Sequence, residues 1–158
     1  MKYFKPEYQD MNILCDPLKR EQVNLLWMKN MAEYTEYFDS IKGLLSPSFL
    51  KIYNRHEGLH DAPMLGIEID TSNKKQCMIV VSLEVNRINY ELVYRGVRAY
   101  NLKMPSIDEW LGKNMRWGYG EIELLSDGYW NHRVLCEGTC EFDIVCKKIS
   151  IRQKKLNN

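Results

Sequence analysis

The stretch CMIVVSLEVNRINYELVYRGV, residues 77–97, decides the fold. Its apolar residues recur at every second position on either side of Asn86-Arg87: Cys77, Ile79, Val81, Leu83 and Val85, then Ile88, Tyr90, Leu92 and Tyr94. A period of two is the pattern of a strand with one buried face, whereas a helix repeats about every 3.6 residues. Because asparagine tolerates the backbone conformations of tight turns, the stretch predicts two antiparallel strands joined at Asn86-Arg87.

Upstream of this hairpin, two capping signals predict two helices. Asp16-Pro17 and Ser46-Pro47 each combine an N-cap side chain with a proline, whose missing N–H costs nothing in the first helical turn. After the first cap, apolar residues recur with helical spacing at Val23, Trp27, Met31, Tyr34, Phe38 and Ile41. Gly43 is a suitable end for this long helix, and the short second helix is expected to end near residues 56–58.

The remaining chain also alternates in most places. Leu65, Ile67 and Ile69 predict a strand before the hairpin, and three more strands are expected at residues 117–125, 129–136 and 140–146. Between these groups, residues 106–112 carry a capping-box pattern that predicts one helical turn. Across Lys147-Lys148 the alternation changes phase, which predicts a bulge or the end of one strand pairing.

Helices followed by consecutive strands indicate an α+β fold. We expect the long and the short helix to pack on one mostly antiparallel sheet of about six strands, with the long helix across one face. The 158 residues suit a single domain, with a helical part at about 16–57 and a sheet part at about 62–152. A hydrophobic fraction of 45% is sufficient for a packed core.

Charge and composition exclude several classes of partner. The net charge of +1 supplies no field that would gather phosphate groups, so no nucleic-acid partner is expected. The chain contains no apolar run of membrane-spanning length, and charges interrupt the N-terminal MKYFKPEYQD before a signal sequence develops. Five cysteines form an odd set in a chain large enough to fold without disulfides, which favours reduced thiols in the cytoplasm.

His60-Asp61 is the first candidate for chemistry. A carboxylate can orient an imidazole and raise its basicity, as catalytic and metal-binding histidines require. Adjacent residues on an extended chain point to opposite faces, however, so we expect these two side chains not to bond to each other. In the structural alternative Gly58 ends the helix, Leu59 packs back on it and Asp61 accepts N–H groups of the turn.

Metal and redox sites receive little support from residue spacing. The three histidines, His56, His60 and His132, lack the ligand spacing of known zinc motifs, so no metal and no cofactor are predicted. Cys136 and Cys140 flank a tight connection at residues 137–139 and could face each other across it. Two free thiols beside the core are favoured over a disulfide in a cytoplasmic chain.

The segment RWGYGEIELL, residues 116–125, carries the strongest binding pattern. Alternation predicts one strand face bearing aromatic and acidic side chains: Trp117, Tyr119, Glu121 and Glu123. An exposed face of this kind would suit a basic partner protein, with the aromatic residues as anchors. In the alternative, the long helix covers the aromatic residues and the glutamates lie at its edge.

Several short motifs are similar to those of one protein group. They are MKYF at residues 1–4, Leu59-His60-Asp61, YELVYRGV at 90–97, Trp117 followed by Glu121-Ile122, and WNHRVL at 130–135. In these the chain resembles small proteins of Gram-positive bacteria, some encoded near polymorphic toxins, whose architecture is immunity-type and whose function is unassigned. The resemblance implies a helix-plus-sheet binding protein of the bacterial cytoplasm, with a toxin-like protein as its partner.

The sequence therefore predicts a non-enzymatic protein-binding or immunity-like domain. Its expected contact residues are Trp117, Tyr119, Glu121 and Glu123, with His60 and Asp61 next. The alternative is a small hydrolase or metal-dependent enzyme that uses His60 and Asp61, with His132 or Glu121. The familiar nucleotide-binding and nucleophile motifs do not occur in the sequence.

Overall fold

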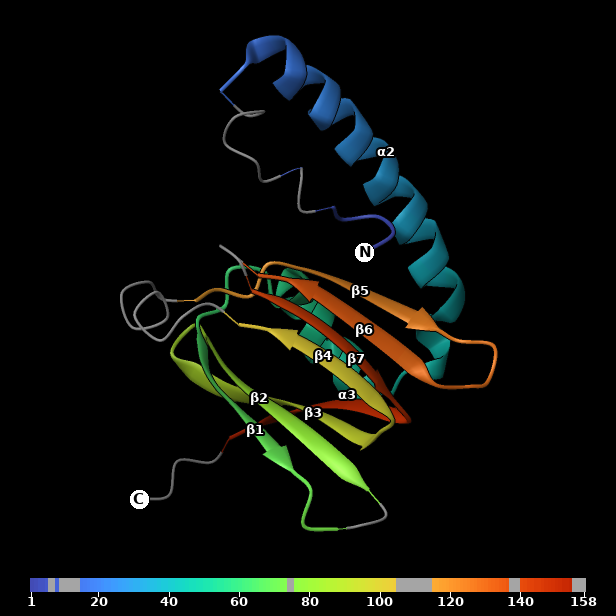
Figure 1. Ribbon diagram of the computed structural model, residues 1–158, viewed down its shortest axis with the longest axis vertical. Helices are drawn as coiled ribbons and strands as arrows, with labels where there is room; N and C mark the ends of the chain where they lie inside the picture. The colour runs from blue at the N-terminus through green and yellow to red at the C-terminus, as the bar shows by residue number, and fades with distance from the viewer. Residues whose placement is uncertain (6–7, 9–14, 74–75, 105–114, 137–139, 155–158) are drawn as a thin grey trace.

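The protein has an α+β fold, and its described residues form two α-helices and two antiparallel sheets (Figure 1). The computed structural model describes residues 1–5, 8, 15–73, 76–104, 115–136 and 140–154. The helical elements are α2 (Pro17–Ile41), η2 (Lys42–Leu44), α3 (Pro47–Arg55) and η3 (Glu57–Leu59). The strands are β1 (Met64–Asp70), β2 (Cys77–Val85), β3 (Ile88–Val97), β4 (Ala99–Lys103), β5 (Tyr119–Leu124), β6 (Trp130–Leu135), β7 (Glu141–Cys146) and β8 (Lys148–Gln153). The predicted fold class is confirmed.

The hairpin of β2 and β3 lies where its alternation predicts. Val85 pairs with Ile88, and the two residues between them, Asn86 and Arg87, have φ of 52° and 63°. Two consecutive left-handed residues are the mark of the tight turn that matches the twist of paired strands. This hairpin forms the middle of one sheet, in the order β1-β2-β3-β8.

A corner in the chain divides the expected single sheet into two. After β3 the chain turns at Arg98 into β4, and after β7 it turns at Lys147 into β8, so each pair of strands continues in the other sheet. Lys147 N–H donates to the carbonyls of Arg95 and Gly96, and Arg98 N–H donates to that of Val145. The second sheet has the order β4-β7-β6-β5. The described residues thus form eight strands in two sheets, where about six in one were expected.

Both helices begin at the predicted caps. The Asp16 side chain accepts from Leu18 and Lys19 N–H, and the Ser46 hydroxyl accepts from Phe49 N–H. The long helix does not cross a sheet face as expected, because its contacts are along the edge strand β5. Phe49 and Tyr53 on α3 enter the main core instead.

Two tyrosines of α2 complete the hydrogen bonding of β5. The Tyr34 hydroxyl accepts from Ile122 N–H at 2.7 Å, and the Tyr37 hydroxyl accepts from Leu124 N–H at 3.0 Å. An edge strand presents such groups unpaired, so a helix that satisfies them blocks pairing with another chain. α2 therefore replaces a neighbouring strand at this edge.

The core has two parts. The larger lies between the inner faces of the two sheets and includes Leu92, Ile122 and Phe142. The smaller joins the N-terminal segment to α2 through Tyr3, Phe4 and Tyr34. Packing of residues 3 and 4 thus holds the beginning of the chain against β5.

One predicted strand face is only partly correct. Ile67 is partly buried and pairs with the buried Val81, but Leu65 and Ile69 are both exposed. A register shift between Met64 and Gly66 turns Leu65 away from the core. The expected helical turn at 106–112, the connection at 137–139 and the tail after 154 lie outside the described residues.

Candidate functional site

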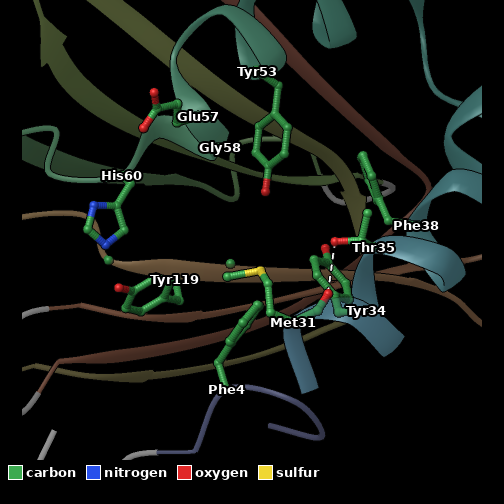
Figure 2. A pocket seen from close by; sticks show the side chains of 12 residues that line it. Phe4, Met31, Tyr34, Thr35, Phe38, Tyr53, Glu57, Gly58, His60 and Tyr119 are labelled. Atoms are coloured by element: carbon green, nitrogen blue, oxygen red, sulfur yellow. Dashed lines mark hydrogen bonds between the residues drawn. The ribbon is translucent and has the colours of Figure 1, made fainter. Parts of the chain in front are cut away.

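A cavity of about 420 Å³ lies between α2, the α3–η3 segment, β5 and the N-terminal segment (Figure 2). Its described lining comes from four stretches that are distant in the sequence: Phe4; Met31, Tyr34, Thr35 and Phe38; Tyr53, Glu57, Gly58 and His60; and Gly118, Tyr119 and Gly120. The volume lies within the range of about 300–1,000 Å³ that is usual for small-molecule sites. Two of the sequence-predicted residues, His60 and Tyr119, are in this lining.

Six rings follow one another around the cavity. The centroid distances are 4.4 Å from His60 to Tyr119, 5.4 Å from Tyr119 to Phe4 and 5.3 Å from Phe4 to Tyr34. The series continues with 5.9 Å from Tyr34 to Phe38 and 6.0 Å from Phe38 to Tyr53. Every step is within the range of direct ring contact. The wall is therefore a nearly continuous aromatic surface.

The Tyr53 hydroxyl points into the cavity (Figure 2). Tyr53 is 7% exposed, and its hydroxyl forms no hydrogen bond with the described residues. Burial raises the pKa of Tyr53 well above its ordinary value, so the phenol is neutral and can donate or accept. Because the hydroxyl faces the cavity, a ligand atom there can hydrogen-bond to it.

His132 lies behind the cavity wall. Its Nδ1 is 2.9 Å from the Tyr94 hydroxyl, whereas its Nε2 is buried without a partner among the described residues. Burial lowers the pKa of His132 to about 3, so the imidazole is neutral at physiological pH. A methyl group added to Gly120 would be 2.9 Å from His132 Nε2 and 3.4 Å from the Tyr53 hydroxyl. Because glycine has no side chain at this position, the backbone of β5 can lie close to both His132 Nε2 and the Tyr53 hydroxyl.

The structure corrects the expectation for His60 and Asp61. His60 Nδ1 is 3.1 Å from Asp61 Oδ2, so the neighbours do pair. Asp61 has φ of 64°, a left-handed conformation, so the rule that adjacent residues of an extended chain point to opposite faces does not apply there. The pKa of Tyr119 is raised, mainly by burial and secondly by the negative charge of the Asp61 carboxylate. Gly58, with φ of 72°, ends the helical segment as the structural alternative expected.

Glu121 binds the N-terminal segment of its own chain. Oε1 accepts from Tyr3 and Phe4 N–H, both at 2.6 Å, and Oε2 accepts from Lys2 N–H at 2.9 Å. The side chain is almost fully buried, with Arg133 Nη1 at 3.9 Å from Oε2. Three N–H donors leave little of this carboxylate for an external partner.

The other predicted contact residues lie in different surroundings. Trp117 is fully buried in the main core beside His132 and Phe142, with its indole N–H unpartnered among the described residues. Glu123 is partly exposed and forms an ion pair with Arg133. The four residues therefore do not form one exposed face. The alternative is right for Tyr119, whose ring contacts Trp27 of α2, but Trp117 lies in the main core and Glu121 lies beneath the N-terminal segment.

The cysteines and histidines form no metal centre in the described part of the chain. All five cysteines are free, and Cys136 and Cys140 are both buried. No group of three or more His, Cys, Asp or Glu side chains is arranged there to hold a metal ion. Within the same residues, no helix has the length and hydropathy required to cross a bilayer.

Most of the cavity lining carries no signal in the sequence that distinguishes it from the core. Tyr34 and Phe38 lie on the predicted apolar stripe of the long helix, and a core position explains both equally well. Phe4 and Tyr53 carry no local signal for a site. The spacing Gly118-Tyr119-Gly120 was the available clue, because two glycines around one aromatic residue suggest close approach of other groups.

Comparisons with known proteins leave the chain without a family assignment. No protein-family model matches the sequence, and no curated protein is significantly similar to it.

Proposed function

We propose that the protein is a non-enzymatic binding protein that holds another protein against the outer face of α2. The observation that carries this proposal is a row of large apolar side chains exposed to solvent: Leu18 at 74%, Leu25 at 64% and Met28 at 68%. Spacings of seven and three residues place these side chains on one face of the helix. The opposite face carries Trp27, Met31 and Tyr34, which pack on the body of the protein.

Glu21, Gln22 and Lys29 lie between the three exposed apolar side chains on the outer side of α2, so this side is a mixed apolar and charged surface. Figure 1 shows the first turns of α2 extending beyond the edge of the sheets, where a partner can reach them. Large exposed apolar residues grouped on one surface are typical of protein contact sites. An amphipathic helix that fits into a groove of its partner is a common form of such contact.

The resemblance to immunity-type proteins supports a toxin-like protein, rather than a second copy of this chain, as the occupant. Five free thiols support a bacterial cytoplasmic setting, because disulfides rarely form there. In this proposal the contact surface is α2. Residues 117–123 hold α2 and the N-terminal segment in place, because Ile122 N–H donates to the Tyr34 hydroxyl and Glu121 accepts from Tyr3 N–H.

Site-specific photo-crosslinking in the native cell tests the proposal. A photoreactive residue at position 25 is expected to capture one other protein, whereas the same residue at position 65 is not. Leu65 is a matched control because it is also an exposed leucine, on β1 of the other sheet. Capture of the same proteins at both positions, or only of a second copy of the chain, would contradict the proposal.

A further inference from the structure

The aromatic cavity offers a site that the proposed contact on α2 does not use. The cavity lies on the side of α2 that packs against α3, η3 and β5. Leu18, Leu25 and Met28 are instead exposed to solvent. We propose that this cavity binds a small organic cation that carries a methylated ammonium group and a hydroxyl. Three independent features lead to this class of ligand.

The first feature is the ring series from His60 through Tyr119, Phe4, Tyr34 and Phe38 to Tyr53. The faces of aromatic rings are electron-rich, and they attract a cation that lies within about 6 Å of the ring centroid. Neighbouring centroids in this series are 4.4–6.0 Å apart, so the rings contact one another and together line the cavity. Figure 2 shows the labelled rings around the cavity, with the Met31 thioether among them.

The second feature is the charge of the lining. Glu57 contributes an exposed carboxylate to the lining, and the described lining contains no lysine or arginine. Outside the lining, the Asp61 carboxylate lies 3.1 Å from Nδ1 of the lining residue His60. Arg116 Nη1 donates to the Asp61 carbonyl from outside the lining. A cation is therefore favoured over an anion in this cavity.

The third feature is the scarcity of hydrogen-bond acceptors inside. A primary ammonium has three N–H donors that need partners, and leaving them unpaired in an apolar site is costly. The Thr35 hydroxyl already donates to the Met31 carbonyl, and the Tyr34 hydroxyl already accepts from Ile122 N–H. Apart from the exposed Glu57 carboxylate at the surface, the main side-chain acceptors of the described lining are then the hydroxyls of Tyr53 and Tyr119. A methylated ammonium has no such requirement, and the Tyr53 hydroxyl can bond to a hydroxyl elsewhere on the ligand.

Calorimetric titration of the purified full chain with choline tests the ligand class. The matched probe is the neutral isostere of choline in which carbon replaces the quaternary nitrogen, because shape and hydroxyl are then unchanged. Choline is expected to bind at least about tenfold more tightly than the isostere. Equal affinity for the two, or no binding of either at millimolar concentration, would overturn the proposal.

Variants of the lining locate the binding. Tyr119→Leu is expected to weaken choline binding several-fold, whereas Tyr100→Leu, at an exposed tyrosine on β4, leaves it unchanged. Glu57→Gln is expected to weaken binding of choline but not of the isostere. Unchanged affinity in both Tyr119→Leu and Glu57→Gln, with the melting temperature retained, would place the binding elsewhere and overturn the proposal.

The same chemistry can come from a free metabolite or from a trimethylated lysine in a peptide. Tighter binding of choline would support the first source, and tighter binding of a trimethyllysine peptide the second. Leu25→Lys on the outer face of α2 is expected to leave both affinities unchanged, so this result is separate from the fate of the protein-contact proposal.

Discussion

Glu121 shows how strongly the surroundings of a residue decide its role. Its position in an alternating aromatic and acidic strand suggested a contact for a basic partner. In the structure its carboxylate accepts three N–H groups of residues 2–4, so it serves as the attachment point of the N-terminal segment. Residues 3 and 4 then supply the smaller core and one ring of the cavity.

Replacing this carboxylate is expected to release the N-terminal segment. Glu121→Gln removes one acceptor oxygen and places an amide N–H₂ group against N–H donors, which we expect to lower the free energy of unfolding by about 1–3 kcal/mol. Hydrogen exchange should show faster exchange of the Tyr3 and Phe4 amides. Glu123→Gln is the control, because Glu123 lies two residues along the same strand and contacts Arg133 instead. Equal protection of residues 3 and 4 in the two variants would argue against the anchoring role of Glu121.

His132 is expected to make stability depend on pH. Its pKa falls from 6.5 to about 3 on burial, so the unfolded chain binds a proton that the folded chain does not in this window. Stability is therefore complete above pH 6.5 and declines as the pH falls toward 3. The loss between pH 7 and pH 5 is expected to be about 2 kcal/mol, since one pKa unit corresponds to about 1.4 kcal/mol.

Urea unfolding of the wild type and His132→Gln at both pH values measures this effect. Glutamine keeps a polar group for the Tyr94 hydroxyl and does not titrate. The variant is expected to lose about 2 kcal/mol less than the wild type between the two pH values. The same pH dependence in both proteins would show that other groups are responsible.

The pairing of His60 with Asp61 marks the limit of residue-level prediction. The sequence identified both residues as the junction between helix and sheet, and Gly58 as its stop. The rule for extended chains then gave the wrong relation between the two side chains, because the left-handed conformation of Asp61 has no unambiguous signal in the residue type.

At the scale of elements, the capping residues and the central hairpin were predictable. Asp16, Ser46 and Asn86-Arg87 act locally, through side-chain acceptors and turn conformations that depend on a few neighbouring residues. The strand β4 was missed because its residues are largely exposed and only Leu102 is partly buried on a core side. The phase change at Lys147 did signal the end of a pairing, which the structure shows as the step from β7 to β8.

The hydrogen bonds from β5 to α2 are expected to contribute to the stability of the protein. Tyr34→Phe leaves the buried Ile122 N–H without its acceptor, and we expect a loss of about 1–3 kcal/mol in the free energy of unfolding. Tyr37→Phe should cost less, because its bond to Leu124 N–H is only partly buried. Chemical denaturation of both variants provides the comparison. A larger loss for Tyr37→Phe would contradict the assignment of Tyr34 as the main acceptor at this edge.

At the scale of the whole molecule, α2, the α3–η3 segment, β5 and the N-terminal segment meet around one aromatic cavity. Phe4, Phe38, Tyr53 and Tyr119 reach it from four separate stretches, so no local pattern could predict the site. The exposed side of α2 differs in this respect, because Leu18, Leu25 and Met28 lie in one short stretch and their helical spacing can be read from the sequence. Their exposure depends on which face of the helix packs on β5, and this requires the tertiary structure.

The central claim is that the outer face of α2 holds a protein partner. The most direct measurement is the dissociation constant of the protein captured at position 25, determined by calorimetry for wild type, Leu25→Lys and Leu65→Lys. Burial of an apolar anchor in the contact predicts that Leu25→Lys weakens binding at least about tenfold while Leu65→Lys matches the wild type. Equal dissociation constants for all three proteins, with each one folded, would contradict the claim.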